Sequence, residues 1–138
     1  QEASQKIISL LKEGKSIALT SDAGYPGISD PGEELVKMCQ EAGVTVTAIP
    51  GPAACITALT ISGLPTRRFA FEGFLTVNKH GRSEMLDSVK NEVRTMIFYE
   101  APHKLIKTLA DMYETFISVS VSYIFAKSTT LRLILSRR

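Results

Sequence analysis

The chain has 138 residues, 44% of them hydrophobic, and a formal net charge of +2 at pH 7. This composition excludes a disordered chain, and no apolar run approaches the roughly 18 residues of a membrane span, so a soluble, cytoplasmic protein without a membrane partner is expected. The net charge does not by itself indicate a nucleic-acid partner, and Cys39 and Cys55 lack the spacing of a metal site, so no metal is expected.

The first part of the chain predicts a strand, a helix and a second strand, after an opening helix over residues 4–12. The apolar run 17–19 and the alternating β-branched run 44–49 predict the strands. The helix between them is predicted by its end signals, which are Asp30 at the N-cap, Pro31, Glu33 and the stop at Gly43. A helical connection implies parallel strands and therefore an α/β fold.

Two loops rich in glycine and proline follow these predicted strands, residues 21–32 and 49–54. The carboxyl ends of parallel strands meet at one sheet edge, where α/β proteins bind cofactors. Neither loop has the pattern of a P-loop or of a dinucleotide-binding fingerprint, which favours a nucleoside without a phosphate chain. For the first loop alone, a purely structural Gly/Pro-rich connector remains an open alternative.

The rest of the chain continues the alternation of helices and strands. A helix over 53–62 ends at Gly63, and a domain boundary after residue 64 is predicted, which gives domains 1–64 and 65–138. The later elements predicted are strand 69–74, helix 83–91, strand 96–99, a helix from Pro102 and a strand over 117–123. Residues 117–138 are atypical, and an edge strand followed by an irregular tail is expected there.

Four motifs in order resemble one family. They are Ser21 to Gly32 (S-D-A-G-Y-P-G-I-S-D-P-G), Pro50 to Ala54 (P-G-P-A-A), Phe71 to Leu75 with Gly81-Arg82 (F-E-G-F-L and G-R) and Phe98 to His103 (F-Y-E-A-P-H). This set resembles the tetrapyrrole methylase-like S-adenosylmethionine methyltransferases over roughly residues 5–116. Within the family the resemblance is strongest to the bacterial enzymes that methylate a cytidine 2′-hydroxyl of small-subunit (16S) ribosomal RNA.

The resemblance implies a two-domain fold with parallel and mixed sheets, S-adenosylmethionine as cofactor in a cleft between the domains, and a homodimer. The chain lacks the family's N-terminal strand and its late R-E-L-T-K segment, so we expect a fragment that is incomplete at both ends. By motif, the residues implied to bind the cofactor are Asp22, Gly24, Tyr25, Ile28, Ser29, Pro52, Ala53, Ala54 and Tyr99.

The same resemblance implies methyl transfer to a ribose hydroxyl, for which Glu100 is the candidate general base and a hydrogen-bonding or capping role is its alternative. Lys79, Arg82 and His103 are candidate RNA contacts, against the alternative of a solvated loop. The aromatic residues of 69–74 are expected to pack in the core. Two other functions stay open: a methyltransferase that acts on a tetrapyrrole carbon, and a non-catalytic cofactor-binding fragment.

Overall fold

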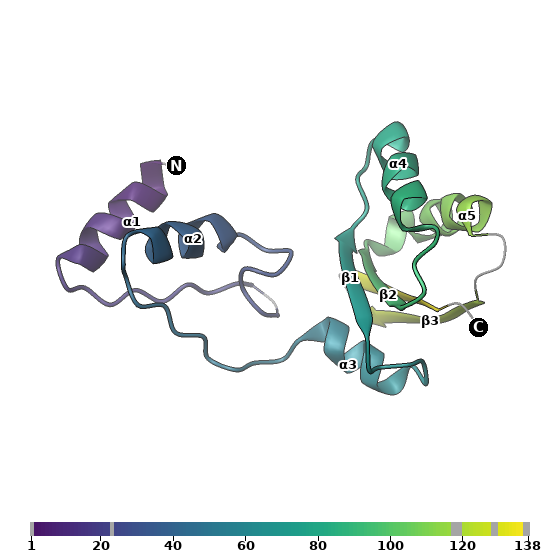
Figure 1. Ribbon diagram of the computed structural model, residues 1–138, viewed down its shortest axis with the longest axis horizontal. Coiled ribbons are helices and arrows are strands. Elements are labelled where there is room, and N and C mark those ends of the chain that lie inside the picture. Colours follow the sequence, from purple (N-terminus) through teal and green to yellow (C-terminus); the bar gives the residue numbers. More distant parts are fainter. Residues whose placement is uncertain (1, 23, 117–119, 128–129, 137–138) are drawn as a thin grey trace. The chain divides into compact units, whose positions relative to one another are not determined.

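A computed structural model of the chain describes residues 2–22, 24–116, 120–127 and 130–136 (Figure 1). The chain divides into two compact units, Gln1–Ala53 and Ala54–Arg138. Helix α3 (Ala54–Ile61) therefore belongs to the second unit, whereas the sequence groups it with the first domain. In the described part of the chain, no helix has the length and apolar character needed to cross a membrane.

The first unit consists of two helices joined by long loops. Helices α1 (Glu2–Lys12) and α2 (Glu33–Glu41) contact each other and agree with the predicted helices. The predicted strands at 17–19 and 44–49 are wrong, because no strand occurs among the described residues of this unit. Two short apolar runs without a third strand bury too little surface to form a stable sheet. Several of their side chains are exposed to solvent, and Ile49 is 85% exposed.

Helix α2 begins later than its sequence signals predict. Its N-cap is Gly32, which has no capping side chain, so the predicted cap at Asp30 is wrong. The Asp30 carboxylate instead accepts a hydrogen bond from the Ser21 hydroxyl (Oγ to Oδ2, 3.0 Å). This bond ties the beginning of the first glycine-rich loop to its end.

The second unit is built on a mixed sheet in the order β1-β2-β4-β3. Strands β1 (Phe69–Phe74) and β2 (Thr95–Glu100) are parallel, and β4 (Thr130–Ser136) runs antiparallel to β2 and to β3 (Ser120–Lys127). This arrangement confirms the α/β class and the predicted edge position of the late strand.

The end of the chain is more ordered than expected. The irregular tail predicted after the edge strand is wrong for residues 130–136, which form β4 between β2 and β3. The sequence of β4 holds Leu131 and the apolar run 133–135 on either side of Arg132, and such an apolar run is consistent with an inner strand. The predicted strand start at residues 117–119 lies outside the described residues.

Helices α4 (Lys79–Val89) and α5 (Leu105–Thr115) cover the sheet together, and a 3₁₀ turn, η1 (Pro102–Lys104), precedes α5 (Figure 1). Their apolar core with the sheet includes Ala70, Leu75, Leu86, Met96, Phe98, Met112 and Phe116. Helix α4 begins before the predicted Ser83, because the Asn78 side chain accepts hydrogen bonds from the backbone nitrogens of the first turn.

Candidate functional site

The described residues of the first loop, 21–22 and 24–32, are rich in turns and bends. Its backbone takes positive φ at Gly24 (84°) and Gly27 (79°), and also at Ser29 (59°), where a side chain is present. The Ser21–Asp30 hydrogen bond closes the loop at its base. Asp22, Gly24, Ile28 and Ser29 are exposed, while Tyr25 is half-buried. The described residues of the loop therefore present backbone, the Asp22 carboxylate, the Ser29 hydroxyl and the apolar side chains of Ile28 and Pro31 to solvent.

The second loop, residues 49–54, approaches the first at Gly51. A Cβ built on Gly51 would lie 3.8 Å from Cδ2 of Tyr25, an ordinary van der Waals distance. The expected approach of the two loops is thus observed within the first unit, although no strands carry them there. Pro52 is exposed beside this contact and Ala53 is half-buried.

The nine residues expected at the cofactor are shared between the two units. Asp22, Gly24, Tyr25, Ile28, Ser29, Pro52 and Ala53 belong to the first unit, and their two loops meet there. Ala54 begins α3, and Tyr99 lies on β2, so both belong to the second unit. Each unit therefore contributes a separate part of the candidate set.

An aromatic cluster lies at the carboxyl ends of the parallel strands of the second unit. The ring of Tyr99 meets Phe71 at 5.0 Å and Phe74 at 5.4 Å between centroids, both in edge-to-face geometry. Regular alternation would place Phe71 and Phe74 on opposite faces of β1. A β-bulge between Phe71 and Gly73, with φ of 64° at Gly73, brings both to the ring of Tyr99.

This cluster corrects one prediction from the sequence. Phe71 is half-buried, but Phe74 is 48% exposed, so the expectation that Phe74 packs in the core is wrong. The motif F-E-G-F carries a signal for this outcome, because a glycine inside a strand pattern favours a bulge.

Glu100, the candidate general base, is held inside the second unit. Its side chain is directed to α5, where Oε2 accepts a hydrogen bond from the Thr108 hydroxyl at 2.6 Å. Oε1 accepts from the backbone nitrogen of Ala101 at 2.7 Å, and the residue is only 6% exposed. Both carboxylate oxygens thus support the turn between β2 and α5, which favours the capping alternative over proton abstraction.

Arg82, a candidate RNA contact, is also committed to internal bonds. Its Nε donates to Asp111 Oδ2 at 2.6 Å, and Nη1 donates to the carbonyl oxygens of Thr76 and Val77, each at 3.3 Å. The residue is buried. Its side chain therefore links α4 to α5 and to the loop before α4. This geometry favours a structural role over contact with a phosphate.

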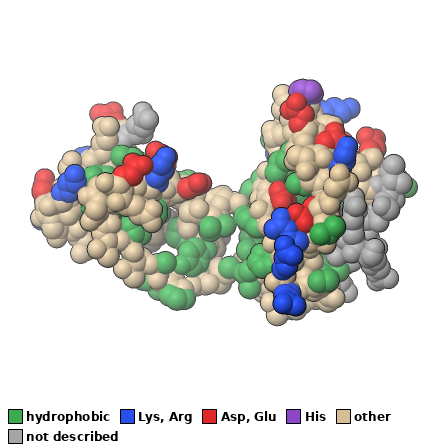
Figure 2. All heavy atoms as spheres, in the orientation of Figure 1, with side chains coloured by type: hydrophobic (Ala, Val, Ile, Leu, Met, Phe, Trp, Pro, Cys, Tyr) green, Lys and Arg blue, Asp and Glu red, His purple; other side chains and the backbone are tan. Residues whose placement is uncertain are grey.

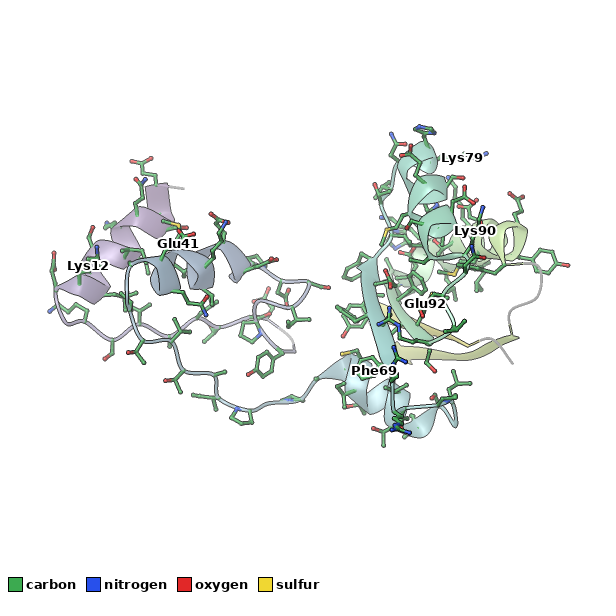
Figure 3. The ribbon with its side chains drawn as sticks, viewed as in Figure 1. Lys12, Glu41, Phe69, Lys79, Lys90 and Glu92 are labelled. Carbon is green, nitrogen blue, oxygen red and sulfur yellow. The ribbon has the colours of Figure 1, made fainter. Side chains whose placement is uncertain are left out.

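Lys79 and His103 remain on the surface of the second unit. Lys79 is the first residue of α4, where Figure 3 shows it at the tip of the helix, and His103 lies in η1. Both are exposed. Nε2 of His80, the neighbour of Lys79, lies 3.3 Å from Oε1 of Glu84. Figure 2 shows basic, acidic and histidine side chains together at this end of the unit.

A tight ion pair precedes β2 in the second unit. Glu92 accepts hydrogen bonds from the side chain of Arg94 and from the backbone nitrogens of Val93 and Arg94. The Arg94 side chain, more than any other group, lowers the pKa of Glu92 to about 2. Among the residues that the structure describes, no cluster of His, Cys, Asp and Glu suits a metal ion.

Comparisons with known proteins identify relatives along almost the whole chain. Residues 1–129 match the family described as Tetrapyrrole (Corrin/Porphyrin) Methylases. Two curated relatives are each named "Ribosomal RNA small subunit methyltransferase I". The one from Synechocystis sp. is 50% identical over 126 residues (91% of this chain, 45% of the relative), and the one from Escherichia coli O157:H7 is 48% identical over 112 residues (81% and 39%).

The chain therefore spans less than half the length of these relatives. Among solved structures, the methyltransferase CobJ superposes with a TM-score of 0.63 at 16% identity, which covers 98% of this chain and 75% of CobJ. That likeness concerns the fold. Because the family match includes most of the residues, the chain belongs to the tetrapyrrole (corrin/porphyrin) methylase family.

Proposed function

We propose that this chain is part of an S-adenosylmethionine-dependent methyltransferase that modifies the 2′-hydroxyl of a cytidine in small-subunit ribosomal RNA. The names of the relatives at about half identity support the RNA substrate. The observation that carries the proposal is the approach of the Tyr25 ring to Gly51, where an added Cβ would lie 3.8 Å from Cδ2 of Tyr25, so that the two family loops are neighbours.

The composition of this surface suits the nucleoside end of the cofactor. Residues 21–32 and 49–54 contain no Lys or Arg, so the loops match an uncharged ribose and adenine better than a phosphate chain. The Asp22 carboxylate can accept hydrogen bonds from ribose hydroxyls, and exposed Ile28 offers an apolar contact to the flat base. The remaining proposed cofactor residues are Gly24, Tyr25, Ser29, Pro52, Ala53, Ala54 and Tyr99.

The chemistry places few demands on the protein beyond positioning. S-adenosylmethionine supplies an electrophilic methyl group on a sulfonium centre. The residues of this chain would hold the cofactor and the ribose in line, which can account for a large part of the rate. Glu100, with both oxygens bonded inside the second unit, supports the end of β2 in this proposal rather than accepting the proton.

The RNA is proposed to contact exposed basic groups of the second unit. Lys79 and His103 are exposed and suit contacts with phosphates, whereas Arg82 is bound to Asp111 and is left out of the RNA surface. A ribosomal RNA substrate implies action in the cytoplasm. By its resemblance to the family, the protein is also proposed to form a homodimer.

Cofactor binding tests the proposal directly. We expect Asp22→Asn to weaken the affinity for S-adenosylmethionine about tenfold or more by calorimetry, because hydrogen bonds to a charged group contribute roughly 1.5–3 kcal/mol. Asp87→Asn, which removes an exposed carboxylate paired with Lys90, should leave the affinity unchanged. Equal affinity of the Asp22 variant and the unaltered chain would remove Asp22 from the cofactor site.

The substrate class is tested by RNA binding at several salt concentrations. Affinity for a fragment of 16S ribosomal RNA should fall steeply as salt rises, and Lys79→Gln should reduce the slope by about one. A chain that binds a tetrapyrrole acid but not this RNA would contradict the proposal.

A further inference from the structure

The aromatic cluster of Phe71, Phe74 and Tyr99 leaves one of its rings open to solvent. Phe74 is 48% exposed, although it ends a strand whose other aromatic neighbours are half-buried. Its ring meets Tyr99 edge to face, at an interplanar angle of 69°. Tyr99 in turn meets Phe71, so the ring that supports Phe74 is itself packed against another aromatic ring. An open aromatic ring on a rigid support is suited to stacking a flat ligand.

The segments on both sides of Phe74 are fixed by specific bonds. Before it, the bulge at Gly73 sets the face of the strand on which the ring lies. After it, Arg82 binds the carbonyl oxygens of Thr76 and Val77, and Asn78 caps the next helix. The ring is therefore held in place before any ligand binds, which lowers the entropic cost of binding.

The place of the ring in the fold also favours a ligand. Phe74 is the last residue of β1, and Tyr99 is next to last in β2, its parallel partner. The carboxyl ends of parallel strands are the usual ligand edge of an α/β sheet. The same connection continues from Phe74 to Lys79, the proposed phosphate contact at the start of α4.

We propose that Phe74, supported by Tyr99, stacks a base of the RNA substrate. This inference rests on the proposed function, because the RNA is the partner that brings exposed bases to this unit. Sequence-specific RNA recognition commonly stacks unpaired bases on aromatic side chains, with basic groups nearby for the backbone. Phe74 and Lys79 supply these two elements from a single strand-to-helix connection.

The chain offers a direct optical test, because it contains no tryptophan. Phe74→Trp introduces one indole at the proposed stacking position, and stacking of a base should quench its fluorescence. Tyr113→Trp is the matched control, since Tyr113 is an aromatic residue of α5 in the same unit and is 78% exposed. A cytidine-containing single-stranded RNA should quench the first variant and leave the control unchanged.

Binding measurements separate stacking from simple apolar contact. The affinity for fluorescently labelled RNA, measured by anisotropy, should fall about fivefold or more for Phe74→Leu and stay near the original value for Phe74→Tyr. Both variants should keep the unfolding midpoint of the unaltered chain, because the side chain is half exposed.

The possible outcomes are distinguishable. If the unaltered chain binds the RNA, but the tryptophan at 74 is not quenched and Phe74→Leu binds equally well, the stacking proposal is overturned and the proposed function stands. If the unaltered chain binds no RNA, both are overturned. If S-adenosylmethionine quenches the tryptophan and RNA does not, the ring serves the cofactor's adenine, and the assignment to RNA is wrong.

Discussion

Arg82 on α4 and Asp111 on α5 form an ion pair in which Nε and Nη2 of the arginine each lie 2.6 Å from Oδ2 of the aspartate. The arginine side chain is only 7% exposed, so water screens this pair weakly. The same guanidinium also binds two carbonyl oxygens of the loop before α4. One buried cation thus joins two helices and the loop that follows Phe74.

The first prediction concerns this pair. Asp111→Asn leaves the guanidinium of Arg82 buried without a countercharge, and we expect it to lower the free energy of unfolding by about 3 kcal/mol. Asp87→Asn is the control, because it makes the same chemical change in an exposed pair with Lys90 and should cost less than about 1 kcal/mol. Urea denaturation followed by circular dichroism measures both. Equal losses would show that the buried pair contributes no more than a surface pair.

The second prediction concerns the carboxylate of Glu100. Thr108→Val removes the hydroxyl that donates to Oε2 and leaves a buried acceptor unpaired, so we expect a loss of about 1–3 kcal/mol in unfolding free energy. Thr108→Ser retains the hydroxyl and should recover most of this loss. In a double-mutant cycle with Glu100→Gln, the two changes should be coupled by more than about 0.5 kcal/mol. Additive effects would mean that the hydrogen bond does not stabilise the unit.

These two contacts show which features of the second unit can be predicted from the sequence and which cannot. Strands β1 and β2 and helix α5 follow from apolar periodicity, which is a local property, and lie where it predicts them, whereas β4 is not predicted. The partner of a buried charge is not a local property. Arg82 pairs across 29 positions with Asp111, and neither residue carries a sequence signal for the other.

The first unit shows a different limit. The β-branched run 44–49 has the composition of a strand, but strand formation also needs a neighbour for its ladder, and none occurs among the described residues of this unit. The approach of Tyr25 to Gly51 does follow from the sequence, because the two residues belong to motifs that the sequence predicts to meet. The exposure of the Phe74 ring does not follow from the sequence alternation, because a β-bulge between Phe71 and Gly73 interrupts that alternation.

The third prediction is a pH dependence at Glu92. The folded state lowers the pKa of this carboxyl from 4.5 to about 2, chiefly through the Arg94 side chain. A lowered pKa contributes stability above the unfolded-state value, and this contribution is lost as the pH falls from about 4.5 to about 2. The difference in unfolding midpoint between the unaltered chain and Glu92→Gln should therefore be present at pH 6 and shrink below pH 4.5.

Glu114→Gln is the control for this measurement, because Glu114 is an exposed carboxylate of the same unit. A decrease below pH 4.5 that Glu92→Gln shows and this control does not is assigned to the Glu92 carboxyl. A difference for Glu92→Gln that is constant with pH would contradict the role of the ion pair in holding the carboxyl charged.

The fourth prediction compares two glycines of the candidate cofactor loops. Gly32 has φ of 138°, and a Cβ there would lie 2.5 Å from Cδ2 of Leu19, so Gly32→Ala requires both a strained backbone and a displaced side chain. We expect a cost of about 1–2 kcal/mol, seen as roughly fivefold to thirtyfold faster amide hydrogen exchange in α2, which begins at the next residue. Gly51→Ala is the matched control, because its Cβ would meet Tyr25 at an ordinary 3.8 Å and should leave exchange in α2 nearly unchanged. If both alanines accelerate exchange equally, neither the positive φ of Gly32 nor its close approach to Leu19 makes alanine unfavourable at this position.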